Sequence, residues 1–158
     1  MLEKIDLNET AGCTCRRARR TARRLIRIFD TALRPSSLSA NQFEVLVYLY
    51  GCRVERRAPV SVGVLADLIG KHPTTLNRDL KPLKQQALVN DMVIPADNRI
   101  RGLMITAKGH AKLSKAVPLW RHAQRNLQKA LGLKTTRALN KLLDLAFARL
   151  AKIDANLD

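Results

Sequence analysis

The feature that most constrains the fold is a pair of short amphipathic segments joined by a tight turn, between residues 61 and 87. Apolar residues recur at helical spacing in residues 61–70 and again in residues 73–87. Gly70-Lys-His72 separates the two segments, and Pro73 suits the first position of a helix, where its missing N–H costs nothing. The predicted buried stripes are Val62, Leu65, Leu68 and Ile69 in the first helix, and Leu76, Leu80 and Leu83 in the second. This pattern predicts a helix-turn-helix.

A β-hairpin is expected directly after the second helix. Residues 88–94 read as one strand, and the chain returns through residues 101–106. Asp97-Asn98 supplies turn chemistry, because both side chains can bond their own backbone and tolerate unusual φ values. The centre of the chain is therefore predicted to be a winged helix-turn-helix, in a fold that is mainly α with a small β-wing.

Two helices are predicted before this centre. Residues 13–34 carry an apolar face opposite an arginine face, and Pro35 ends the helix. Ser39-Ala-Asn-Gln42 matches a capping box that opens the next helix. Gly51 is the expected end of that helix, followed by a polar loop.

Two long helices are predicted after the hairpin. Thr106 can cap the first, Gly132 marks a break, and the last helix covers roughly residues 135–156. The small centre cannot cover all the apolar faces of the outer helices, so we expect a two-fold symmetric dimer. The expected division of the single domain is residues 1–35 and 107–158 for dimerisation and residues 36–106 for the winged helix-turn-helix.

The charge balance predicts a polyanionic partner. The 158 residues carry 29 Lys and Arg against 13 Asp and Glu, a formal net charge of +16. No apolar run approaches the ~18 residues that cross a bilayer. The polar N-terminal segment does not resemble a secretory signal, so we expect a cytoplasmic protein without a membrane partner. Aromatic residues make up 4% of the chain, which is lean for stacking on unpaired bases.

The second helix of the motif is the candidate reader of double-stranded DNA. With its leucines buried, its polar residues point outward and can reach base edges in the major groove. Arg78 can pair with guanine, Asn77 with adenine, and a threonine methyl can touch thymine. Arginines near the hairpin tip suit the narrow minor groove. The candidate DNA-binding residues are Pro73, Thr74, Thr75, Asn77, Arg78, Lys81, Arg99 and Arg101. The alternative is that these are solvated polar positions on an ordinary surface.

The stretch LADLIGKHPTTLNRDLKPLKQQALV followed by DNRIRGLMITAKG resembles the multiple-antibiotic-resistance regulator (MarR) family of bacterial transcription factors. Asp97, Arg99, Ile105, Thr106 and the Lys108-Gly109 step fill the places of the family's wing pattern. The N-terminal run CTCRRARRTARRLIRIFDTALRPSSLSANQF resembles a CxC-bearing subgroup of the same family. The resemblance covers about residues 13–150. One departure is His72, which stands where the family has a serine or aspartate cap.

The resemblance implies a homodimer that binds a pseudo-palindromic operator and usually represses genes. It also implies release by a small phenolic ligand or by oxidation. The family's ligand pocket lies between the first, second and fifth helices and the DNA-reading part. Its candidates here are Phe43, Val47, Tyr50 and Trp120, each of which also fits a plain hydrophobic core.

The cysteines are candidates for redox sensing. Cys13 and Cys15 lie at the expected start of the arginine-rich helix, and helix N-termini and nearby cations favour the reactive thiolate. Cys52 could be a resolving partner or a buried core residue. The other reading of Cys13 and Cys15 is a pair of small residues at a frayed helix end. The seven arginines within residues 16–27 could contact phosphates, bind an acidic effector or simply form a solvated face.

No motif supports an enzyme, because the chain has no Gly-rich phosphate loop, no clustered carboxylate pair and no nucleophile–base motif. No cofactor is expected, and CxC lacks the spacing of common zinc sites. We therefore expect a sequence-specific transcriptional regulator, a repressor, that binds double-stranded DNA as a homodimer and responds to a small effector. The alternatives are a non-specific nucleic-acid-binding or architectural protein and a thiol redox protein.

Overall fold

The computed structural model describes residues 10–94 and 97–154, with the backbone alone for residues 97–100 and 154. Its elements are α1 (Thr14–Leu33), a 3-10 turn η1 (Arg34–Ser36), α2 (Ala40–Val54), β1 (Val60–Ser61), α3 (Val62–Ile69), α4 (Pro73–Gln85), β2 (Val89–Ile94), β3 (Asp97–Ile105), α5 (Ala107–Leu131) and α6 (Leu133–Asp154). The predicted fold class, mainly α with a small β-wing, is confirmed.

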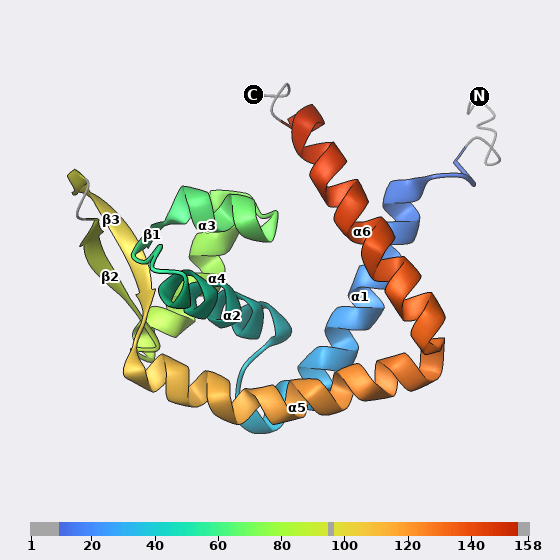
Figure 1. Cartoon of the computed structure of the whole chain (residues 1–158), viewed down its shortest axis with the longest axis horizontal. Coiled ribbons are helices and arrows are strands. Elements are labelled where there is room, and N and C mark those ends of the chain that lie inside the picture. Colours follow the sequence, from blue (N-terminus) through green and yellow to red (C-terminus); the bar gives the residue numbers. More distant parts are fainter. Residues whose placement is uncertain (1–9, 95–96, 155–158) are drawn as a thin grey trace, which may run out of the picture.

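The long helix α5 runs along one side of the molecule and connects its two halves (Figure 1). The elements from α2 to β3 gather over the N-terminal end of α5, and we call them the head (residues 40–105). Helix α1 packs across α5, while α6 rises from its C-terminal end, and we call these two helices the arm. Head and arm therefore face each other across α5.

The core of the head is built from the predicted leucine stripes. Leu76, Leu80 and Leu83 of α4 are fully buried, as is Leu65 of α3. The other three residues of the α3 stripe pack at the edge of the same cluster. Complete burial of three leucines spaced at i, i+4 and i+7 fixes the rotation of α4, so its opposite face must point outward.

A three-stranded antiparallel sheet in the order β1-β3-β2 forms the wing. Val89 of β2 pairs with Ile105 of β3, and Val60 of β1 pairs with Leu103 on the other edge of β3. Leu103 and Ile105 are fully buried, as the alternation of apolar residues predicts. Strand β1 was not predicted, because two residues are too few to show a period.

The ends of two helices follow their capping residues. The Ser39 side chain accepts from the Gln42 amide and the Gln42 side chain accepts from the Ser39 amide, which confirms the capping box. Thr106 Oγ1 accepts from the Gly109 amide at 2.9 Å and donates to the Ala87 carbonyl at 2.8 Å. Gly109 is required here, because a Cβ at this position would overlap the carbonyl oxygen of Leu88.

The prediction that α2 ends at Gly51 is wrong, since the helix continues to Val54. Two tertiary contacts hold the added turn. Cys52 is buried in the core with 2% of its surface exposed. The guanidinium of Arg53 donates to the carbonyl oxygen of Ile105 at 3.4 Å. These contacts outweigh the low helix propensity of a single glycine.

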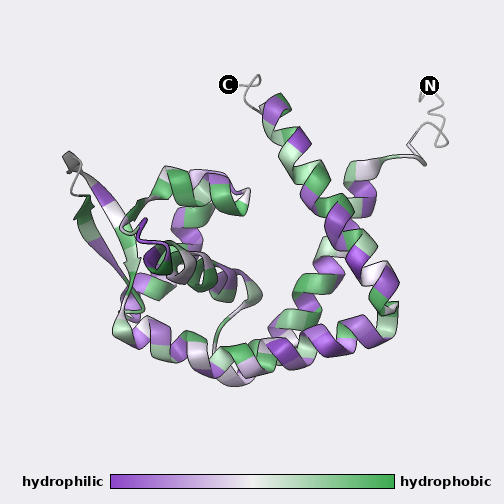
Figure 2. Cartoon of the chain, viewed as in Figure 1, coloured by the Kyte–Doolittle hydropathy of each residue, from purple (hydrophilic) through white to green (hydrophobic). Residues whose placement is uncertain are grey.

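The arm leaves large apolar side chains uncovered. Hydrophobic residues recur along α1 and α6 in Figure 2, and the exposed ones on α6 include Leu142 (63%), Leu143, Phe147, Leu150 and Ile153. Single exposed apolar residues are ordinary, but a continuous helical stripe indicates an interaction surface.

One aromatic ring of the arm reaches the head. Gly70, the C-cap of α3, has a φ of 71°, and a Cβ there would lie 2.6 Å from Cε2 of Phe147. The ring of Phe147 on α6 therefore rests against the turn that precedes α4. This contact spans the opening between head and arm.

Candidate functional site

The outward face of α4 carries the polar residues that the sequence singled out. Thr74, Arg78 and Lys81 are all exposed and follow one another at i, i+4 and i+7, opposite the buried leucines. Thr75 and Asn77 are exposed at the two edges of this face, and Pro73 is the first residue of the helix. The structure thus brings all six α4 candidates onto one accessible helix.

His72 acts as the N-cap of α4. Its Nδ1 accepts from the Thr74 amide at 3.3 Å, which satisfies one of the free amides of the first turn. Histidine therefore takes over the capping role of the serine or aspartate that the family pattern has at this place. The imidazole is exposed at the start of the candidate recognition helix.

The wing carries one described arginine candidate, Arg101. Arg101 is exposed on β3 and pairs with Val93 of β2. The side chain of Arg99 lies outside the part of the chain that the structure describes. Lys84 of α4 forms an ion pair with Asp91 at 2.7 Å and so joins α4 to β2.

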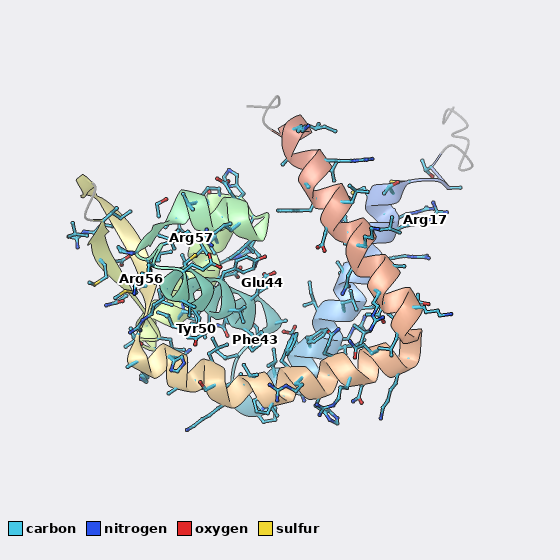
Figure 3. The ribbon with its side chains drawn as sticks, in the orientation of Figure 1. Arg17, Phe43, Glu44, Tyr50, Arg56 and Arg57 are labelled. Carbon is cyan, nitrogen blue, oxygen red and sulfur yellow. The ribbon has the colours of Figure 1, made fainter. Side chains whose placement is uncertain are left out.

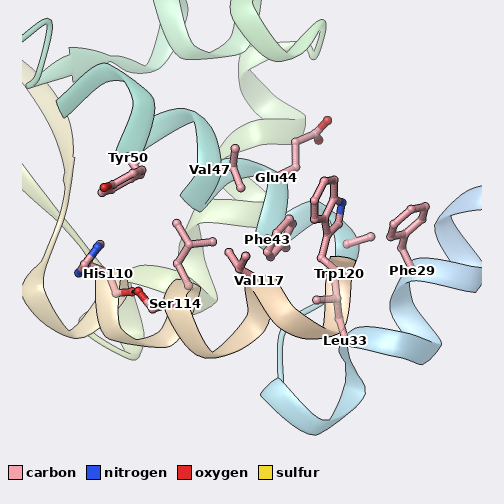
Figure 4. Close-up of a pocket in the computed structure, with 12 residues that line it drawn as sticks. Phe29, Leu33, Phe43, Glu44, Val47, Tyr50, His110, Ser114, Val117 and Trp120 are labelled. Carbon is pink, nitrogen blue, oxygen red and sulfur yellow. The ribbon is translucent and has the colours of Figure 1, made fainter. Parts of the chain in front are cut away.

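A cavity of about 740 Å³ lies between α1, α2 and α5 (Figure 4). All four predicted pocket residues line it: Phe43, Val47, Tyr50 and Trp120. The Phe43 and Trp120 rings stack with centroids 6.1 Å apart, and Tyr50 stacks on His110 at 5.1 Å. A cavity of this size, lined mostly by apolar and aromatic groups, suits a small organic ligand.

Several lining residues were missed by the sequence interpretation, above all Phe29, Glu44 and His110. Phe29 comes from α1 and His110 from the first turn of α5. Because these residues are far from α2 along the chain, no local pattern indicated that they line the same cavity. Glu44 adjoins the predicted Phe43, but a single carboxylate on a helix gives no sequence signal for a pocket. Figure 3 shows Phe43, Glu44 and Tyr50 projecting from α2, with Arg17 on the separate arm.

The cysteines occupy two different places. Cys13 is the N-cap of α1, where its Sγ accepts from the Arg16 amide at 3.4 Å, and Cys15 is exposed one residue into the helix. Cys52 is buried in α2. The start of α1 and helix α2 lie at opposite sides of the molecule in Figure 1, which separates Cys52 from the CxC pair.

The arginine-rich face of α1 is fully open to solvent. All seven arginines are exposed, namely Arg16, Arg17, Arg19, Arg20, Arg23, Arg24 and Arg27. They lie on the arm and not on the head that carries α4.

Among residues 10–94 and 97–154, no group of three or more His, Cys, Asp or Glu side chains is placed to hold a metal ion. Within these same residues, no helix has the length and apolar character that a membrane crossing needs.

A solvent-facing α4, capped and preceded by a tight turn, with a β-hairpin beside it, defines a winged helix-turn-helix protein. No family model and no curated sequence matches the chain. Among solved structures, the chain is 37% identical to the M. tuberculosis transcriptional regulator MosR in complex with DNA. That match covers 87% of this chain and 98% of MosR, with a TM-score of 0.70.

Two further structures share the fold at lower identity. The transcriptional repressor CouR, bound to a 23-mer DNA duplex, is 23% identical over 91% of this chain and 99% of CouR, with a TM-score of 0.73. A mutant of MarR from E. coli, complexed with operator DNA, is 22% identical over 90% of this chain and 99% of MarR, with a TM-score of 0.74. The chain belongs to the MarR family of transcriptional regulators.

Proposed function

We propose that the protein binds operator DNA as a homodimer and represses transcription. The observation that carries this proposal is the exposed face of α4 with Thr74, Arg78 and Lys81. The wing adds a further exposed arginine, Arg101. Helix α4 enters the major groove, where Arg78 and Asn77 contact base edges and Lys81 contacts phosphate. Arg101, together with Arg99, contacts the adjacent minor groove. That MosR was crystallised with DNA supports this assignment.

The arm and α5 supply the dimer interface in this proposal. Residues 1–35 and 107–158 associate with their counterparts in a second copy, while residues 36–106 hold the DNA. The uncovered apolar stripe of α6 supports the division, because a second copy would remove that stripe from water. The two α4 helices then address half-sites of a pseudo-palindrome about 10 bp apart, or a multiple of that.

Release from DNA follows from a small aromatic or phenolic ligand in the cavity, or from oxidation of Cys13 and Cys15. The aromatic lining of Phe43, Tyr50 and Trp120 supports the first route, and the exposure of both thiols at the start of α1 supports the second. MosR, CouR and MarR are transcriptional regulators, which favours a regulator over an enzyme.

A competition titration tests the proposal. Fluorescently labelled DNA from upstream of the protein's own coding region is bound near physiological salt and competed with the same DNA unlabelled or scrambled. We expect a specific advantage of ~10³ or more. If both DNAs compete equally, and the affinity for both falls together as the salt concentration rises, the architectural alternative is favoured, in which charge alone drives binding.

A further inference from the structure

The cavity contains one fixed charge, and it is negative. Among the described residues that line it, Glu44 is the single carboxylate, His110 contributes an imidazole, and the remaining ten side chains are uncharged. Figure 4 shows the Glu44 carboxylate at the edge of the cavity, and 42% of its side chain is exposed. No lysine or arginine of the described lining offers a partner for an anionic ligand.

Glu44 is also tied to the recognition helix. Its Oε2 lies 3.2 Å from Nζ of Lys71, in the turn between α3 and α4. The same Nζ donates to Oδ2 of Asp79, on α4, at 3.2 Å. Lys71 and Asp79 are largely buried, each with 17% of its side chain exposed. One ammonium group thus joins the edge of the cavity to α4.

This trio carries more negative than positive charge, since two carboxylates share one ammonium. Screening is weaker at Lys71 and Asp79 than at a fully exposed pair, because both side chains are mostly out of water. A second cation arriving from the cavity would find an unbalanced carboxylate at Glu44. The rings of Phe43 and Trp120 would present apolar and π-electron surface to the same ligand.

We propose that the cavity binds an organic cation with an aromatic body. The ammonium group of this ligand replaces Lys71 as the ion-pair partner of Glu44, which loosens the turn before α4. This inference rests on the proposed function, because the turn is regulatory only if α4 binds DNA. A ligand carboxylate would be repelled by Glu44. The preferred effector is therefore an aromatic amine, and a phenolic ring is acceptable only without an acid group.

The ligand preference can be measured without DNA. Trp120 is the only tryptophan of the chain and lines the cavity, so its emission reports occupancy directly. The matched probes are 4-phenylbenzylamine and 4-phenylbenzoate, which share their rings and differ in the sign of their charge. We expect the amine to bind at least about tenfold more tightly. Glu44→Gln should abolish that preference. Glu55→Gln, at the C-terminal cap of α2 and outside the cavity lining, should keep it.

An amine that leaves the Trp120 emission unchanged, or binds no better than the acid, would overturn the proposal. So would a preference that survives in a folded Glu44→Gln variant, with folding checked by circular dichroism. These results do not depend on DNA binding, so a failure of the proposed function would be seen separately in the competition titration.

The coupling is tested by adding the amine to the protein–DNA complex. We expect it to weaken operator binding by the wild-type protein and by Glu55→Gln. Glu44→Gln should bind DNA with an affinity that the amine no longer changes. An amine that occupies the cavity yet leaves wild-type DNA affinity unchanged would refute the link through Lys71.

Discussion

Among single residues, Arg78 and Lys81 share one face of α4 but are expected to do different work. We predict that Arg78→Ala removes sequence preference, because a bidentate guanine contact is worth about 1–3 kcal/mol of discrimination. Lys81→Ala should weaken all DNAs alike and lower the salt slope by about one. Anisotropy titrations on operator and scrambled DNA at several salt concentrations measure both effects. Equal losses of preference from the two substitutions would contradict this division of labour.

Gly70 is a second residue whose replacement has a defined cost. Gly70→Ala should destabilise the protein by about 1–2 kcal/mol, since alanine is strained at positive φ. The added methyl also meets the ring of Phe147, so the cost should shrink but not vanish in a Phe147→Ala background. Urea unfolding at fixed protein concentration gives the free energies. Gly51→Ala is the control, because Gly51 lies inside α2 with open space around it and should lose nothing.

Among the elements, the start of α1 is where oxidation would act. Peroxide would oxidise the thiols of Cys13 and Cys15 to a disulfide and be reduced to water, which removes the Cys13 cap from the Arg16 amide. Cys13→Ser keeps a capping side chain but removes the thiol, so we predict that it abolishes peroxide-triggered release of DNA. DNA binding with and without peroxide is the measurement. Cys52→Ser should respond like the wild type, and an unchanged response in Cys13→Ser would exclude Cys13 as the sensor.

Local sequence patterns predicted most elements but not where tertiary contacts override them. The α4 leucines and the Ser39 capping box are set by residues within a few positions of one another, so their spacing was sufficient. The last turn of α2 depends instead on Arg53 reaching Ile105, far along the chain. Strand β1 likewise exists through its pairing with Leu103 of β3.

For the site, the exposed α4 face followed from the same leucine period, whereas the four pocket residues came from the family resemblance. The link from Glu44 through Lys71 to Asp79 was not predictable in either way. Lys71 was read as part of a tight turn, and its two partners lie on different helices. Ion pairs between separate elements leave no period in a sequence.

For the whole molecule, association should depend on the uncovered stripe of α6. We predict that Leu142→Glu combined with Leu150→Glu turns a dimer into a monomer, because a charge in an apolar interface loses its hydration. Light scattering after gel filtration gives the mass. Asn140→Glu adds a charge at another exposed α6 position and should leave the mass unchanged. A variant that stays dimeric after both leucine substitutions would remove α6 from the interface.

The contact between the ring of Phe147 and Gly70 limits one movement of the molecule, the approach of α6 to the head. Head and arm are both attached to α5, so bringing them closer would press this ring into the backbone of the turn. The ring of Phe147 therefore limits how closely α6 can approach the turn before α4. We expect a smaller residue at position 147 to let the head tilt further toward α6. In the proposed dimer, this tilt would change the distance between the two α4 helices.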